Sequence, residues 1–451
     1  MTSPFEAARS HFLQGVALFE AGDTPGAEQA LRASLALLPG RPSTLVNLGA
    51  VLLRLGRAPE ALALLDEALV ADPAQPDAWC HRAVACSELG RDAEALAHLQ
   101  RAFTLGCNLP AAHHHHALVL NRLGRHAEAL TALQPLLHAA AAHAADTAAD
   151  TAAVTADTTP ASVQLLLGQT WQALGRLPQA RQAYEAAVAQ APRLAEAWMH
   201  LGLLLNDLGE TAAASHALRR ARDADGDLPL LAYFSAALND GPVPATAPLA
   251  YVRGLFDPYA EGFEQHLVAE LRYSGHEAVV NAAATWHPGP AAVALDLGCG
   301  SGLCGELLHP RVQRLEGVDL SPTMVAQARA RGCYDAVLEA ELVQHLQSRQ
   351  GAVDIAVAAD VFIYIGDLAP VFAAVSRVLA PRGVFAFTVE HDEAAAPYRL
   401  QRSLRYAHSE AGLRALAAAH GFVVRQARPL VLREDQRQPV AGLVLVLQPG
   451  G

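Results

Sequence analysis

The sequence predicts an α + α/β chain, in which an all-α superhelical solenoid precedes a domain with a mainly parallel sheet and an antiparallel last strand. Two observations indicate this: a tripeptide recurs every 34 residues in the first half, and short β-like runs alternate with helical segments in the second. A length of 451 residues suffices for two or three domains. We expect the solenoid over 1–239, a Pro-rich linker over 240–250 and the α/β domain over 251–451.

The tripeptide Leu-Gly-Arg marks the repeat. It occurs, with Leu-Gly-Glu as its last copy, at Leu55–Arg57, Leu89–Arg91, Leu123–Arg125, Leu174–Arg176 and Leu208–Glu210. Every step is 34 residues except the third, which is 51, and its 17 additional residues fall in an Ala/Thr/Asp-rich insertion near 139–159. A period of 34 with small residues at fixed places, such as Gly49 and Gly168, is typical of helix–turn–helix repeats because paired helices can approach closely there.

The array resembles the tetratricopeptide repeat (TPR) family over about residues 8–228, in six copies, with 228–239 as a capping helix. The resemblance implies a concave groove that binds a protein or peptide partner. One polar residue per repeat stands at the twelfth position: Ser87, Asn121, Gln172 and Asn206. This row either recognises a peptide backbone or is a solvated face. His113 and His116 could share a metal, but no carboxylate is spaced to join them, so we expect no metal.

The second half contains seven β-like runs, at 293–297, 315–319, 336–339, 353–359, 384–389, 422–432 and 440–447. Most are separated by segments with helical periodicity, as in a parallel sheet covered by helices. The last two are separated only by Arg433–Pro439, which leaves no room for a helix. They must therefore form a hairpin, which adds an antiparallel strand to the sheet.

Glycines and carboxylates follow the first strands. The first strand leads into a Gly-x-Gly-x-Gly loop with Gly298, Gly300 and Gly302. Asp319 ends the second strand 19 residues after Gly300, where a carboxylate can bind ribose hydroxyls. Glu341 follows the third strand, Asp360 the fourth, and Asp296 precedes the loop, where it can anchor an ammonium group. A nucleoside with an amino-acid cation suits these carboxylates better than NAD does.

On these motifs the domain resembles the seven-stranded, Rossmann-like S-adenosylmethionine-dependent methyltransferases. Phe256–Leu267 and Arg405–Ser409 also match predicted bacterial methyltransferases that carry TPR repeats. The resemblance implies S-adenosylmethionine as cofactor and Tyr259 on a flap-like leading helix. It implies cofactor contacts from Asp296, Gly298, Cys299, Gly300, Gly302, Asp319, Leu320, Glu341, Leu342 and Asp360.

Catalytic residues are less evident. His391 follows the fifth strand and is our candidate base, and Tyr364 follows the fourth. Ala358–Tyr364 lacks the motifs of adenine, glutamine and arginine methylation. The acceptor is then a small molecule, a carrier-bound group or a protein side chain. The alternative function is a TPR scaffold whose methyltransferase-like domain is structural or senses the cofactor.

The amino-acid composition argues against several other classes of function. All 33 basic residues are Arg, so lysine Schiff-base chemistry and a Walker lysine are absent. The net charge of −12 disfavours nucleic acid as a partner. Six cysteines without a Cys-x-x-Cys pair disfavour a disulfide framework or structural zinc. We expect no membrane span and a cytoplasmic location.

Overall fold

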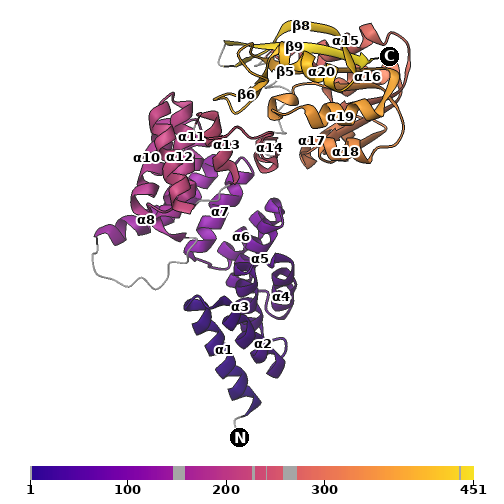
Figure 1. The fold of residues 1–451 in the computed structure, drawn as a ribbon. Coiled ribbons are helices and arrows are strands. Elements are labelled where there is room, and N and C mark those ends of the chain that lie inside the picture. Colours follow the sequence, from indigo (N-terminus) through magenta and orange to yellow (C-terminus); the bar gives the residue numbers. More distant parts are fainter. Residues whose placement is uncertain are drawn as a thin grey trace. The chain divides into compact units, whose positions relative to one another are not determined.

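The computed structural model describes residues 3–145, 158–225, 229–239, 241–256, 272–435 and 438–450. The chain divides into two compact parts, Met1–Leu204 and Leu205–Gly451 (Figure 1). Each part is described by itself. No helix among the described residues is both long enough and apolar enough to cross a membrane.

The first part contains most of the predicted helical array, whose last residues fall in the second part. Its helices pack as consecutive pairs, and the eleventh crosses into the second part. The helices are α1 (Pro4–Glu20), α2 (Thr24–Leu37), α3 (Pro42–Arg54), α4 (Ala58–Ala71), α5 (Pro76–Glu88), α6 (Asp92–Thr104), α7 (Pro110–Arg122), α8 (His126–Ala145), α9 (Pro160–Ala173), α10 (Leu177–Gln190) and α11 (Ala195–Asp207). The predicted insertion begins within α8, and residues 146–157 of it lie outside the described residues.

The small residues of the repeat act as expected. A Cβ on Gly168 of α9 would lie 2.4 Å from the Tyr184 ring of α10, so only glycine permits this approach. The tripeptide ends the first helix of each pair. Gly56 and Gly90 adopt left-handed φ angles of 71° and 74° directly after α3 and α5, a conformation that glycine adopts without steric cost.

The second part contains the remaining helices and one mixed sheet. Its helices are α12 (Thr211–Asp225), α13 (Pro229–Ala237), α14 (Leu249–Phe256), α15 (Gly275–Trp286), α16 (Leu303–Leu308), α17 (Pro322–Ala330), α18 (Leu342–Ser348), α19 (Ala369–Val378) and α20 (Glu410–Ala419). α13 is the predicted capping helix. Its strands are β1 (Ala291–Leu297), β2 (Val312–Asp319), β3 (Ala336–Glu339), β4 (Val353–Ala358), β5 (Leu379–His391), β6 (Tyr398–Leu400), β7 (Tyr406–His408), β8 (Phe422–Asp435) and β9 (Gln438–Pro449).

The topology confirms the predicted fold class. Strands β3, β2, β1, β4 and β5 lie side by side and parallel, while β9 pairs antiparallel with both β5 and β8. The seven predicted strands are all present, and the last two form the predicted hairpin. Two further strands were not predicted: β6 and β7 pair antiparallel, and β7 adds to the carboxyl end of β5. Each has only three residues, too few for an alternating pattern to be recognised.

Both faces of the sheet are buried, as a parallel sheet requires. Along β5, Phe385 and Phe387 face one apolar cluster, which includes residues of α18, α19 and α20. The alternate residues Val384 and Ala386 face a second cluster with residues of α15 and α16. This period of two fixes the register. Because these strands are parallel, their carboxyl ends meet at one edge of the sheet.

The predicted linker is more than a spacer. Its Ala245 carbonyl accepts from the backbone N–H groups of Gly366 and Asp367, each at 2.8 Å, and the Ala247 N–H donates to the Tyr364 carbonyl at 2.9 Å. These bonds attach the segment to the loop that follows β4. A Pro-rich segment cannot form a helix, so its remaining polar groups pair with this loop instead. α14 begins inside the predicted linker, at Leu249. The domain limits of 239 and 251 stay a prediction.

Candidate functional site

A cavity of about 450 Å³ lies at the carboxyl ends of β1, β2 and β4. It lies where ligands bind in open α/β sheets. Nine of the predicted cofactor-binding residues line it: Asp296, Gly298, Cys299, Gly300, Asp319, Leu320, Glu341, Leu342 and Asp360. Gly302 instead precedes α16 as its N-cap, and Tyr259 lies outside the described residues.

The glycine loop is tied to the second strand. The N–H groups of Gly298 and Cys299 both donate to the Val318 carbonyl, at 2.8 and 3.0 Å. Gly298 has a φ of 69°, and a Cβ there would lie 2.5 Å from Val361. Because both the backbone and the available space exclude a side chain, the loop exposes its backbone to the cavity.

Two of the acidic residues have backbone partners. Asp319 accepts from the Gly300 N–H at 2.8 Å and from the Ser321 N–H at 2.9 Å, one with each oxygen. Glu341 accepts from the N–H groups of Val343 and Gln344, at 3.0 and 2.8 Å, and so caps α18. A carboxylate has about four acceptor positions, so Glu341 keeps capacity for a ligand.

Asp296 has a different environment. Its side chain is 1% exposed and accepts a hydrogen bond of 2.7 Å from the Tyr334 hydroxyl. Burial raises the pKa of Asp296 from 3.8 to about 7, and Asp319 adds to the increase while the Tyr334 bond opposes it. The ionised form is therefore costly here, and a cation in the cavity would stabilise it.

Arg433 was missed by the sequence analysis, which placed it in the hairpin turn. β8 extends through Asp435, so Arg433 lies within the strand and is 2% exposed. Its Nη1 donates to both Asp360 oxygens, at 2.9 and 2.8 Å, and its Nη2 pairs with Glu390. Burial raises the pKa of Glu390, although Arg433 and Arg405 oppose this. No sequence signal distinguished Arg433 from the polar residues beside it.

The two candidate catalytic residues lie in different places. Tyr364 lines the cavity, and burial raises the pKa of its phenol, which keeps it protonated at neutral pH. His391 is not among the residues that line the cavity and instead contacts Glu393 Oε1 through Nε2 at 3.0 Å. The geometry therefore does not bring the predicted base to the cavity, because His391 is the last residue of β5 and pairs there with His408 of β7.

Two buried polar atoms of the cavity wall lack partners among the described residues. They are the Ser301 hydroxyl and Nδ1 of His276, and both residues line the cavity. His276 stacks on Tyr273 with a ring separation of 5.4 Å, and burial lowers its pKa. Unsatisfied buried groups are rare in folded proteins, so this pair favours a polar ligand. A lone histidine early in a helix had given no sequence signal.

The first three residues of the polar row, Ser87, Asn121 and Gln172, form hydrogen bonds with other side chains of the array. The Ser87 hydroxyl donates to Asp92 at 3.1 Å, Asn121 Nδ2 donates to Thr170 at 2.7 Å, and Gln172 accepts from Tyr184 at 2.8 Å. His113 and His116 both contact the Phe103 ring. Asn206 is different, since its amide donates to the Arg402 backbone carbonyl at 3.3 Å.

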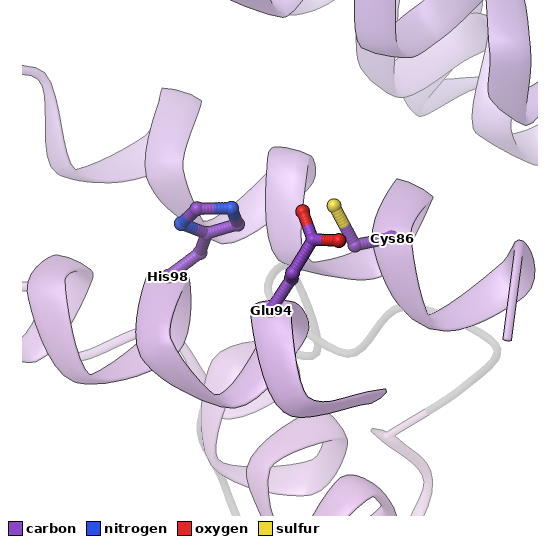
Figure 2. Close-up of side chains that lie close together, drawn as sticks. All are labelled: Cys86, Glu94 and His98. Atoms are coloured by element: carbon purple, nitrogen blue, oxygen red, sulfur yellow. The ribbon is translucent and has the colours of Figure 1, made fainter. Parts of the chain in front are cut away.

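One cluster in the array resembles a metal site. Cys86, Glu94 and His98 place one potential ligand atom each within 4.8 Å of one another (Figure 2). Glu94, however, is paired with Arg91 through both oxygens, and Arg82 contacts Nε2 of His98. Equivalent Arg–Glu pairs recur one repeat earlier and one later, at Arg57–Glu60 and Arg125–Glu128. The carboxylate thus belongs to a structural pair of the repeat, and we assign the cluster no metal.

Comparison with known families agrees with both halves of the chain. A family model described as "Methyltransferase domain" matches residues 295–387. Models described as "Tetratricopeptide repeat" match residues 18–84, 110–135 and 165–229.

Two curated relatives each match about a quarter of the chain. Nodulation protein S from Rhizobium tropici is 36% identical over 109 residues, which is 23% of this chain and 45% of that protein. Trans-aconitate 2-methyltransferase from Escherichia coli is 30% identical over 131 residues, 28% of this chain and 51% of that protein. The chain thus spans about half the length of these relatives. A solved structure, the N-methyltransferase NodS from Bradyrhizobium japonicum with S-adenosyl-L-homocysteine, is 18% identical, covers 39% of this chain and 86% of its own, and has a TM-score of 0.33.

These findings give the class of the protein. The chain combines tetratricopeptide repeats with a methyltransferase domain.

Proposed function

We propose that this protein is an S-adenosylmethionine-dependent methyltransferase acting on a small molecule, a carrier-bound group or a protein. We further propose that its repeats bind a protein, either a partner or the substrate. The observation that supports the enzyme most directly is Asp296, a buried carboxyl in a nucleoside-sized cavity whose only hydrogen-bond partner among the described residues is a neutral phenol.

The residues of the cavity fit the cofactor. Asp319, with the adjacent Leu320, would hold the ribose hydroxyls, while Glu341 and Leu342 would hold the adenine. Asp296 would face the ammonium group. Ser301 and His276 have unpaired polar atoms in the same wall and would donate to the carboxylate of the amino-acid moiety. When bound, the cofactor supplies a methyl group on a positively charged sulfur.

The contribution of the protein to such a reaction is mainly orientation. Alignment of a nucleophile with a methyl carbon removes much of the barrier to an in-line displacement. Tyr364 is protonated in the cavity and would therefore act as a hydrogen-bond donor to the acceptor. His391 does not line the cavity, so its role as the base stays a prediction that no contact of the cavity supports. Trans-aconitate 2-methyltransferase, one of the relatives, is named for a small carboxylic acid, which favours a small acceptor.

Calorimetry tests the cofactor proposal. The full chain is titrated with S-adenosylmethionine and S-adenosylhomocysteine, and we expect one site for each. The Asp319→Ala variant should bind weakly while keeping its fold. A folded wild-type chain that binds neither compound would refute the enzyme and leave the scaffold function. The acceptor class is then tested with labelled S-adenosylmethionine and cell extract, separated into protein and small-molecule products.

A further inference from the structure

A short hairpin beside the cavity carries a cavity-lining arginine. β6 and β7 form this hairpin, and its tip is the turn 401–405. We name the segment Tyr398–His408 the strap. Within the tip, the Gln401 N–H donates to the Arg405 carbonyl at 2.8 Å and the Leu404 N–H donates to the Gln401 carbonyl at 2.9 Å. Arg405 lines the cavity together with Tyr364.

Two helices hold the strap: the capping helix α13 through Tyr233, and α11 of the last repeat through Asn206. Tyr233 of α13 is fully buried, and its hydroxyl donates to the Leu404 carbonyl at 2.5 Å. Asn206, the last member of the polar row, donates to the Arg402 carbonyl. Both contacts are side-chain bonds to backbone carbonyls. Side chains of α11 and α13 thus bind the backbone of the strap, which is also how a peptide groove binds its ligand.

Further contacts hold the same hairpin. The Tyr406 hydroxyl donates to the Pro244 carbonyl at 2.8 Å, and Gln401 donates to Glu390 at 2.6 Å. The rings of Tyr233 and Tyr251 lie 5.3 Å apart, and those of Tyr233 and Tyr406 lie 6.2 Å apart. The hairpin is therefore held by α11 and α13, by the segment around Pro244 and by β5.

The backbone at the contact is strained. Leu404 has a φ of 61°, a left-handed conformation that costs a branched residue about 1–2 kcal/mol. Such a conformation persists where the surroundings determine it. Here the carbonyl of Leu404 accepts from Tyr233, and the next residue along the chain is Arg405. The Tyr233 hydrogen bond therefore acts on Leu404, whose backbone conformation determines where Arg405 meets the cavity.

We propose that Tyr233 is a positioning residue for the acceptor, acting through Arg405, and that the capping helix α13, together with Asn206 of the last repeat, serves this function rather than external binding. The inference rests on the proposed methyltransferase function. It assigns Arg405 to the acceptor part of the cavity, because the carboxylates that fit the cofactor lie on β1, β2 and α18 whereas Arg405 enters beside Tyr364 from the strap.

Limited trypsin digestion of the full chain tests the contact. Trypsin cleaves after arginine, and Arg402 is exposed at the strap tip. The Tyr233→Phe variant loses one hydrogen bond, and we expect cleavage after Arg402 to accelerate about fivefold. Tyr184→Phe is the matched control, since it removes a hydroxyl from a second buried tyrosine, which lies in the repeats and donates to Gln172 rather than to the strap. Equal cleavage of the two variants would overturn the proposal.

Kinetics separate positioning from general structure. With labelled S-adenosylmethionine and an acceptor fraction from extract, Tyr233→Phe should raise the half-saturating amount of acceptor about fivefold and leave that of S-adenosylmethionine unchanged. Arg405→Gln should have at least this effect, and the double variant should be no worse than Arg405→Gln alone. Additive effects, or faster cleavage with unchanged acceptor saturation, would refute action through Arg405. A wild type that binds no cofactor would refute the proposed function instead, and the digestion would still decide whether the repeat segment holds the strap.

Discussion

Replacing Asp296 by Asn should stabilise the α/β domain above neutral pH. The pKa of this carboxyl rises from 3.8 to about 7 on folding. Folding therefore opposes its ionisation, and stability is lost as pH rises from about 4 to about 7. A shift of about three units at 1.4 kcal/mol each gives an upper limit of about 4 kcal/mol. Asn cannot ionise, so the variant escapes this cost.

The expected signature is a pH dependence. Below pH 4 both chains carry a neutral side chain at 296 and should differ little. The variant should then gain stability relative to wild type up to pH 7 and keep a constant advantage above it. Hydrogen exchange of peptides from β1, corrected for intrinsic rates, reports the local opening energy in a chain with two compact parts. Asp354→Asn is the control, because Asp354 accepts from two N–H groups at the other end of β1.

Cofactor affinity should change in the opposite direction. If the ammonium group binds the ionised carboxylate, affinity of the wild type should fall about tenfold per pH unit below 7 and stay constant just above it. Asp296→Asn should bind weakly at every pH. A stability difference that does not vary with pH would refute the assignment of a protonated buried Asp296. Equal affinity of the two chains at pH 8 would refute its role toward the cofactor.

Three further predictions concern Asp319, Arg433 and Gly168. Asp319→Ala should lower cofactor affinity at least tenfold by calorimetry while the thermal unfolding midpoint changes little; unchanged affinity would show that the ribose lies elsewhere. Arg433→Met should cost about 3–5 kcal/mol in chemical denaturation, because it leaves Glu390 buried without its cation, and Glu390→Gln in that background should restore part of this. Gly168→Ala should destabilise the array by about 1–3 kcal/mol through collision with Tyr184, and a Tyr184→Leu change should relieve it; additive losses would contradict close packing as the cause.

The sequence predicted the architecture well because its signals are local and periodic. The 34-residue spacing follows from glycines such as Gly56 and Gly168, whose backbone angle or packing excludes other residues. The strands with buried faces were found from their apolar runs. The terminal hairpin was predicted from the length of the connecting segment alone, since the seven residues Arg433–Pro439 cannot hold a crossover helix.

The parts that were missed depend on contacts distant in sequence. Arg433 became a buried partner of Asp360 only because β8 extends further than its apolar run, and the two residues are 73 positions apart. The partner of Asn206 lies 196 positions away. His391 is not among the residues that line the cavity for a related reason. His391 does end a strand, but β7 pairs with that end, and no sequence pattern predicted a three-residue strand there.

The position of a cationic ligand follows from comparing the acidic groups of the cavity. Asp319 and Glu341 accept backbone N–H groups, and Asp360 accepts from Arg433. Asp296 has only a neutral phenol among the described residues. A buried carboxylate without compensation either binds a proton or requires a cation. In the unliganded chain Asp296 binds a proton over a wider pH range, up to its raised pKa of about 7, so a ligand that favours the charged form must bring its positive group to Asp296. An amino-acid ammonium meets this requirement, whereas the neutral or anionic groups of other nucleosides do not.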